Sequence, residues 1–161
     1  MAKRVLMVIA PAGAPALESA ACSAAAVARE SGGVVRMAWM QPLPPARVDR
    51  HDRVVADPDR EMARLTEIAM ERMRALAWDF GEVDVERVVR FGRLSTELAV
   101  EAHAWSADLI GLAAPVRPTP AQHLRAWYLA RTVSVPLVLL PIQRSGGGGR
   151  RRESTVLPAF R

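Results

Sequence analysis

Five short apolar runs recur along the chain, and a segment with helical spacing separates each run from the next. The runs cover residues 5–10, 34–40, 83–91, 108–114 and 136–142. Continuous apolar runs of this length are typical of strands buried on both faces, as in parallel sheets. Strands that alternate with helices favour a parallel sheet covered on both sides. The sequence therefore predicts an α/β fold, a three-layer αβα sandwich around a five-stranded, mainly parallel sheet.

The helices between the runs are predicted from apolar spacing and from capping residues. Residues 17–31 carry an alanine-rich stripe, and Gly32-Gly33 ends the helix. Asp57-Pro58 opens a long helix that Gly81 stops. Ser95 is expected to cap a third helix that reaches Trp105. A capping box at 119–122, with proline at its first turn, opens a fourth helix to about residue 133. The proline-rich stretch 41–55 is predicted to be loop.

Composition narrows the classes of protein that fit. The 161 residues suggest one domain, predicted at 1–143, with a flexible tail at 144–161. One cysteine, Cys22, allows no internal disulfide and fits a cytoplasmic location; a packed thiol is expected there. No apolar run is long enough for a membrane span. Lys3 is the single lysine and precedes the first strand, which excludes a phosphate-loop lysine.

Charge is concentrated at the end of the chain. Residues 143–161 hold five arginines and one glutamate, whereas residues 1–142 have a net charge of +1. A domain that binds duplex nucleic acid usually carries its basic residues on a structured face, so nucleic-acid binding is not expected. Ser145–Gly149 is a flexible linker. The basic and apolar residues beyond it suggest a docking motif that orders on a protein partner, and an unselected tail is the equal alternative. The candidate docking residues are Arg150, Arg151, Arg152, Val156, Leu157 and Phe160.

Several phrases at the predicted strands resemble the universal stress protein family over residues 3–142. They are Lys3–Val8 in the first strand, Ser106–Ile110 at the fourth and Val135–Leu140 at the last. The resemblance implies a stress-related bacterial protein and a homodimer paired through the last strand. Many members of that family bind ATP through an aspartate after the first strand and a loop of pattern G-x2-G-x9-G-[ST] after the fourth.

This chain departs from that ATP pattern at both places. Ala10 occupies the aspartate position, and residues 113–120 contain no glycine. Counting back from the last strand aligns His123-Leu124 with the final Gly-Ser pair, whereas counting forward aligns Ala126-Trp127, so two registers stay open. Proline has no N–H, and Pro115, Pro118 and Pro120 remove three donors from a loop that would hold phosphate by backbone N–H groups. No cofactor is therefore expected, and ATP in particular is not. The degenerate pocket would comprise Ala10, Met40, Ala114, Arg117 and His123.

No enzyme motif is recognisable. The histidines at 51, 103 and 123 lack partners at metal-ligand spacing, and Asp49 and Asp52 beside His51 are expected to be solvated. The sequence thus predicts a non-enzymatic regulatory protein that dimerises and docks a partner by its tail. The alternative is a stress regulator that binds an adenine nucleotide through an altered phosphate loop.

Overall fold

The computed structural model describes residues 2–10, 17–45, 47–48, 50 and 54–142. Its main sheet has the strand order β5-β2-β1-β6-β7, and every neighbouring pair is parallel. These strands are β1 (Arg4–Ile9), β2 (Val34–Gln41), β5 (Val85–Phe91), β6 (Leu109–Pro115) and β7 (Leu137–Ile142). The predicted five-stranded parallel sheet is confirmed. The third and last of the predicted strands, β5 and β7, lie at its two edges.

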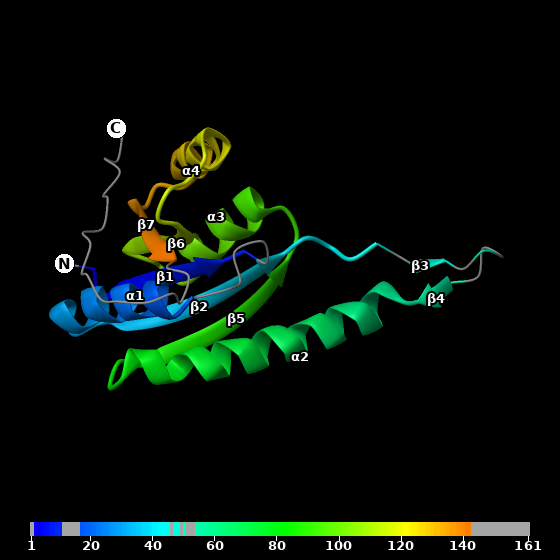
Figure 1. Cartoon of the computed structure of the whole chain (residues 1–161), viewed down its shortest axis with the longest axis horizontal. Helices are drawn as coiled ribbons and strands as arrows, with labels where there is room; N and C mark the ends of the chain where they lie inside the picture. Colours follow the sequence, from blue (N-terminus) through cyan, green and yellow to red (C-terminus); the bar gives the residue numbers. More distant parts are fainter. Residues whose placement is uncertain (1, 11–16, 46, 49, 51–53, 143–161) are drawn as a thin grey trace.

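Four helices cover the two faces of the sheet (Figure 1). Helices α1 (Glu18–Ser31) and α2 (Pro58–Leu76) lie on one face, and α3 (Leu94–Ala104) and α4 (Pro120–Thr132) lie on the other. The core accordingly falls into two apolar clusters, because side chains alternate between the faces of a strand. Val5 and Met7 pack with α1 and α2, whereas Leu6 and Val8 pack with α3 and α4.

Two predicted helix starts are confirmed at atomic detail. Asp57 caps α2 by accepting a hydrogen bond from the Asp59 N–H at 3.3 Å. Thr119 caps α4 through a complete capping box with Gln122. The Gly32-Gly33 stop of α1 is confirmed as well. Gly32 has a φ of 58°, and a Cβ on Gly33 would lie 2.3 Å from the Lys3 carbonyl oxygen. The second glycine therefore permits β2 to start directly against β1.

The capping role predicted for Ser95 is wrong. Helix α3 begins at Leu94, its N-cap is Arg93, and that cap makes no side-chain hydrogen bond. The Glu97 N–H donates to the Arg93 carbonyl at 2.9 Å, which starts the helical ladder two residues earlier than expected. Ser95 thus lies within the first turn, where a hydroxyl cannot serve as the cap.

The stretch predicted as loop contains a small hairpin. Strands β3 (Arg47–Val48) and β4 (Val54–Ala56) pair antiparallel in a separate two-stranded sheet. Figure 1 shows this hairpin and the first turns of α2 extending beyond the main sheet. The buried residues of α2 are Ala69, Met73 and Leu76, all in its second half. After Leu76 the chain continues as the 3-10 helix η2 (Ala77–Phe80) and stops at Gly81, as predicted.

No helix in the described ranges is both long and apolar enough to cross a membrane.

Candidate functional site at the carboxyl ends of the strands

Three residues of the predicted pocket lie side by side across neighbouring strands. Val8 pairs with Ala38 on β2 and with Leu112 on β6. Two residues further along, the same register sets Ala10 beside Met40 and Ala114. Met40 is 4% exposed and Ala114 is 8% exposed, whereas Ala10 is half-buried. We call these three apolar residues at the carboxyl ends of the strands the apolar floor. Ligands of open α/β sheets usually sit at this edge.

The start of α4 offers few donors to a phosphate. The Gln122 N–H donates to Thr119 Oγ1 at 3.3 Å, and the Thr119 N–H donates to Gln122 Oε1 at 2.7 Å. The His123 N–H donates to the Thr119 carbonyl, and Pro120 has no N–H. The Ala121 N–H is then the one amide of this turn left for a ligand. A helix start binds phosphate with several free N–H groups together, and this start has a single one left.

Both alignments of the family Gly-Ser pair fall inside α4. His123-Leu124 lies in its first turn and Ala126-Trp127 in its second. Neither position is part of a loop, and the N–H groups of a helix interior are committed to the i→i−4 ladder. Arg117 and His123 are both exposed, Arg117 in the short connection after β6 and His123 on α4. Both candidates therefore lie around a capped helix start instead of a phosphate loop.

An ion cluster around one buried carboxylate, which the sequence did not predict, lies under α3. The buried Glu101 carboxylate of α3 receives Arg36 Nη1 from β2 at 2.6 Å and Arg90 Nη2 from β5 at 2.6 Å. Arg36 also pairs with Glu86 of β5. The Arg36 guanidinium lies 4.8 Å from the ring centre of Trp105. The two arginines and two glutamates balance in charge, and they tie α3 to strands β2 and β5.

The cluster holds Glu101 as an anion. Burial alone would raise the pKa of the Glu101 carboxyl, but hydrogen bonds and charge from Arg36 and Arg90 outweigh it, so the pKa lies below its usual value. Both carboxylate oxygens are occupied by guanidinium groups. A general acid needs a raised pKa and a reachable proton. This carboxylate has neither, so its role is structural.

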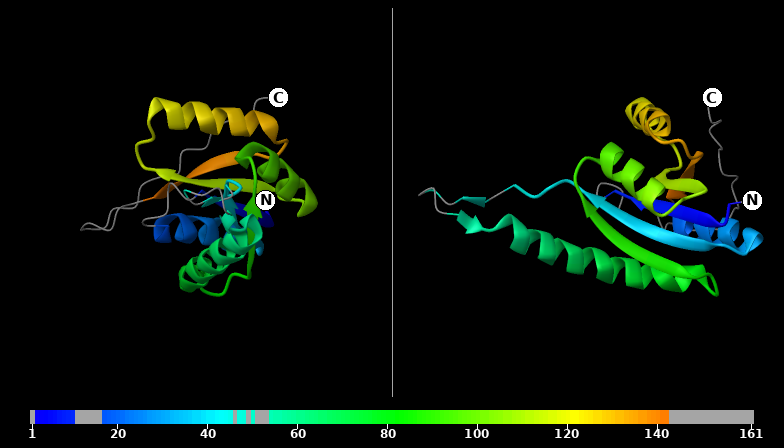
Figure 2. Two further views of the ribbon diagram at one scale, coloured as in Figure 1. Left: turned by 90° about the vertical axis from the view of Figure 1, so that its right-hand side faces the viewer. Right: turned by 180° about the vertical axis from the view of Figure 1, so that it is seen from behind.

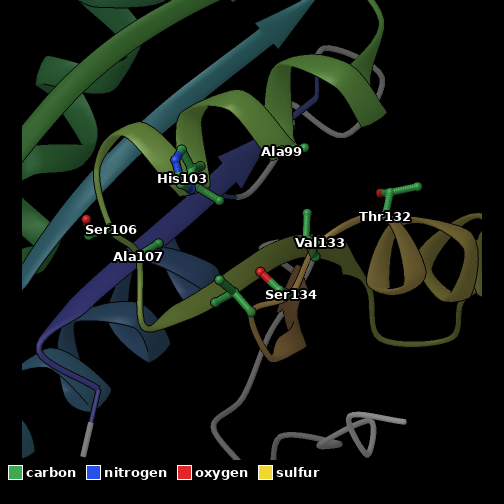
Figure 3. A pocket seen from close by; sticks show the side chains of 9 residues that line it. Ala99, His103, Ser106, Ala107, Thr132, Val133 and Ser134 are labelled. Atoms are coloured by element: carbon green, nitrogen blue, oxygen red, sulfur yellow. The ribbon is translucent and has the colours of Figure 1, made fainter. Parts of the chain in front are cut away.

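A pocket of about 330 Å³ opens at the opposite end of β6, between the last turns of α3 and α4 (Figure 3). Its lining supplies the His103 imidazole and the hydroxyls of Ser106, Thr132 and Ser134. Thr132 Oγ1 donates to the Leu129 carbonyl at 2.8 Å. None of the nine lining residues is a carboxylate that could orient His103. The lining therefore lacks the carboxylate of a nucleophile–base–acid arrangement.

The remaining sequence candidates are dispersed. His103 is exposed, while His51, Asp49 and Asp52 lie outside the described residues. Cys22 is exposed on α1, which corrects the expectation of a packed thiol; α1 turns its buried alanines to the sheet and Cys22 away from it. Burial of part of the thiol raises the pKa of Cys22, and Asp79 raises it further, which disfavours the reactive thiolate. Within the described ranges, no three His, Cys, Asp or Glu side chains are grouped to hold a metal ion.

Comparison with known families and structures gives one consistent result. The sequence model of the universal stress protein family matches residues 1–141. The comparison with curated proteins finds no match.

Solved structures with the same fold include universal stress proteins. A universal stress protein in complex with cAMP is 21% identical, with a TM-score of 0.58, over 88% of this chain and 99% of that one. A family member from Burkholderia pseudomallei is 14% identical, with a TM-score of 0.59, over 86% and 96%. The Archaeoglobus fulgidus protein in complex with dAMP is 15% identical, with a TM-score of 0.50, over 87% and 98%. At these identities the likeness establishes the fold.

Proposed function

The chain belongs to the universal stress protein family, and we propose that it is a non-enzymatic member that works by association and not by family-type ATP binding. The observation that carries this proposal is the start of α4. Its first turn leaves one amide, that of Ala121, for a ligand, where relatives with the glycine motif would present several free N–H groups. A stress-related role and a cytoplasmic, bacterial setting belong to the same proposal.

Self-association is assigned to the free edge of β7. The Ile110 N–H donates to the Pro136 carbonyl at 2.9 Å. Because backbone direction alternates along a parallel strand, Leu137, Leu139 and Pro141 point their backbone groups away from β6. Pro141 has no N–H, and its carbonyl accepts a hydrogen bond from Ser19 Oγ at 2.6 Å. A second β7 strand would therefore bond to Leu137 and Leu139.

The proposed pairing predicts a selective effect of proline at Leu139. Leu139→Pro removes one outward N–H and leaves the bonds between β6 and β7 in place. We expect the dissociation constant of the dimer to rise about tenfold, which corresponds to about 1.4 kcal/mol. The circular dichroism spectrum should stay unchanged. Light scattering over a concentration series measures the dissociation constant. A chain that is monomeric at every concentration, or a dimer that this variant leaves intact, would rule out pairing through β7.

A heterologous partner is assigned to the tail, residues 144–161, which lies outside the described residues. Its arginines and its apolar residues Val156, Leu157 and Phe160 suit an acidic, partly apolar surface. Affinity purification from the native host with the full chain and with a chain ending at residue 143 tests this role. Proteins that bind the full chain alone support it, and identical profiles contradict it.

Binding of an adenine nucleotide is the second candidate. Two structures with this fold hold cAMP and dAMP. The apolar floor of Ala10, Met40 and Ala114 could lie against a base, because a base needs no phosphate cradle. Calorimetry with AMP and ATP separates the candidates. If the base is recognised without the phosphates, both nucleotides bind equally, and Ala114→Trp, which would fill the floor, abolishes both signals.

A further inference from the structure

Helix α4 turns apolar side chains away from the molecule. Leu124 is 65% exposed, Trp127 is 46% exposed and Tyr128 is 52% exposed. Spacings of three and four place these residues on one face of the helix. Ala126 and Leu129 are buried on the opposite face. Among the helices and strands drawn in Figure 2, α4 is the outermost element on its side of the sheet. We call Leu124, Trp127 and Tyr128 the outer face of α4.

The charged residues along the segment that carries the outer face are all arginines. Residues 109–142 contain Arg117, Arg125 and Arg131 and neither aspartate nor glutamate. The Arg131 guanidinium lies 4.9 Å from the ring centre of Trp127. A partly exposed tryptophan and tyrosine each leave on the order of 100 Å² to be covered by a partner. Aromatic residues and arginine are also the side chains enriched at protein interfaces.

We propose that the outer face of α4 docks an amphipathic helix of a partner protein whose apolar stripe is flanked by aspartate or glutamate. The apolar spacing on α4 matches helix-on-helix packing, and the flanking arginines complement acidic residues on the partner. This surface differs from the β7 edge and the tail, although it rests on the proposed role as an association protein.

The same residues disfavour other occupants. Two α4 helices facing each other would bring Arg125 and Arg131 of both copies together with no carboxylate from either helix to offset them. Arg131 already covers the ring of Trp127, so that the ring is less available to stack on a nucleobase. Leu124 is the most exposed of the three. Its aliphatic side chain can be covered by the apolar side chains of a partner helix, but it offers no aromatic ring on which a nucleobase could stack.

A synthetic peptide tests the proposal on the full chain. The probe is a fluorescein-labelled, 20-residue helical peptide with leucines at heptad spacing and glutamates beside them, and its control carries lysines in place of the glutamates. We expect the acidic peptide to bind with a dissociation constant below about 100 μM, at least tenfold tighter than the lysine peptide, and to weaken as salt screens the charges. Fluorescence anisotropy measures both. No binding of the acidic peptide at 1 mM, or equal binding of the two, would overturn the proposal.

Matched variants locate the binding on α4. Leu124→Ser is expected to weaken the acidic peptide at least fivefold, whereas Leu43→Ser, which alters a leucine of almost equal exposure (64%), leaves binding unchanged. Arg125→Glu with Arg131→Glu should reverse the preference between the peptides, and Arg60→Glu on α2 should not. Three other results would refute an acidic helix as the partner. If Leu124→Ser dissociates a dimer, the face belongs to a second copy of the chain. If Leu124→Ser abolishes binding to anionic vesicles or to oligothymidine, and the acidic peptide does not compete with that binding, the face belongs to a membrane or to a single-stranded nucleic acid. Nucleotide binding is measured by calorimetry and β7 pairing by light scattering. A failure of either proposal is therefore distinguishable from a failure of the acidic peptide to bind α4.

Discussion

Replacing Glu101 by glutamine tests how the ion cluster holds α3 on the sheet. The substitution keeps the side-chain shape but removes the charge shared by Arg36 and Arg90, which contact the two carboxylate oxygens. A hydrogen bond to a charged group contributes about 1.5–3 kcal/mol, and breaking a buried pair costs about 3–5 kcal/mol. Arg36 keeps Glu86, and both guanidinium groups reach solvent. We therefore expect the free energy of unfolding to fall by about 3 kcal/mol.

Urea unfolding at two pH values measures this loss and its pH dependence. The native pKa of Glu101 is below its unfolded value, so the native state binds this proton more weakly. The stabilisation is then fully present above the unfolded pKa, about 4.3, and is lost as pH falls through the native pKa. The difference between the two proteins should shrink at low pH. A loss below about 1 kcal/mol at pH 7, or a difference that stays constant as pH falls, would refute the assigned role of the cluster.

Three backbone and nucleotide-site predictions are independent of the cluster. Ser106 has a φ of 53° at the end of α3, in the left-handed region. Ser106→Gly should relieve this strain and raise the free energy of unfolding by up to about 1 kcal/mol. A loss of stability in urea unfolding would contradict this. Gly33→Ala would place a Cβ 2.3 Å from the Lys3 carbonyl oxygen; we expect a loss of about 2 kcal/mol or more by the same assay, and unchanged stability would show that β1 and β2 are less tightly joined. Thr119→Ala should cost about 1 kcal/mol through the lost cap without creating nucleotide binding in calorimetry, because the prolines remain.

The main elements could be predicted because their signals are local. Apolar runs predicted the five strands of the sheet, and the capping residues Asp57 and Thr119 predicted two helix starts correctly. Ser95 failed because the backbone ladder from Arg93 began α3 without any side-chain cap. The β3–β4 hairpin was missed because its strands are two and three residues long, too short to show alternation.

The ion cluster and the outer face of α4 escaped prediction for different reasons. Arg36 interrupts an apolar strand and Glu101 lies inside a helix, which are visible irregularities. Their pairing spans 65 residues of sequence, and only the register of β2 and β5 beneath α3 brings them together. Leu124, Trp127 and Tyr128 stand at helical spacing in the sequence, but helical spacing alone does not tell an outward stripe from a buried one. The burial of Ala126 and Leu129 settles which side of α4 faces the sheet.

Titration calorimetry of the full chain with Mg-ATP tests the central claim most directly. Because the capping box and the prolines leave the α4 start with one available first-turn amide, we expect no saturable heat up to about 1 mM nucleotide, which is weaker than about −4 kcal/mol. A dissociation constant below about 10 μM, roughly −7 kcal/mol, would contradict the claim that this family member works without ATP.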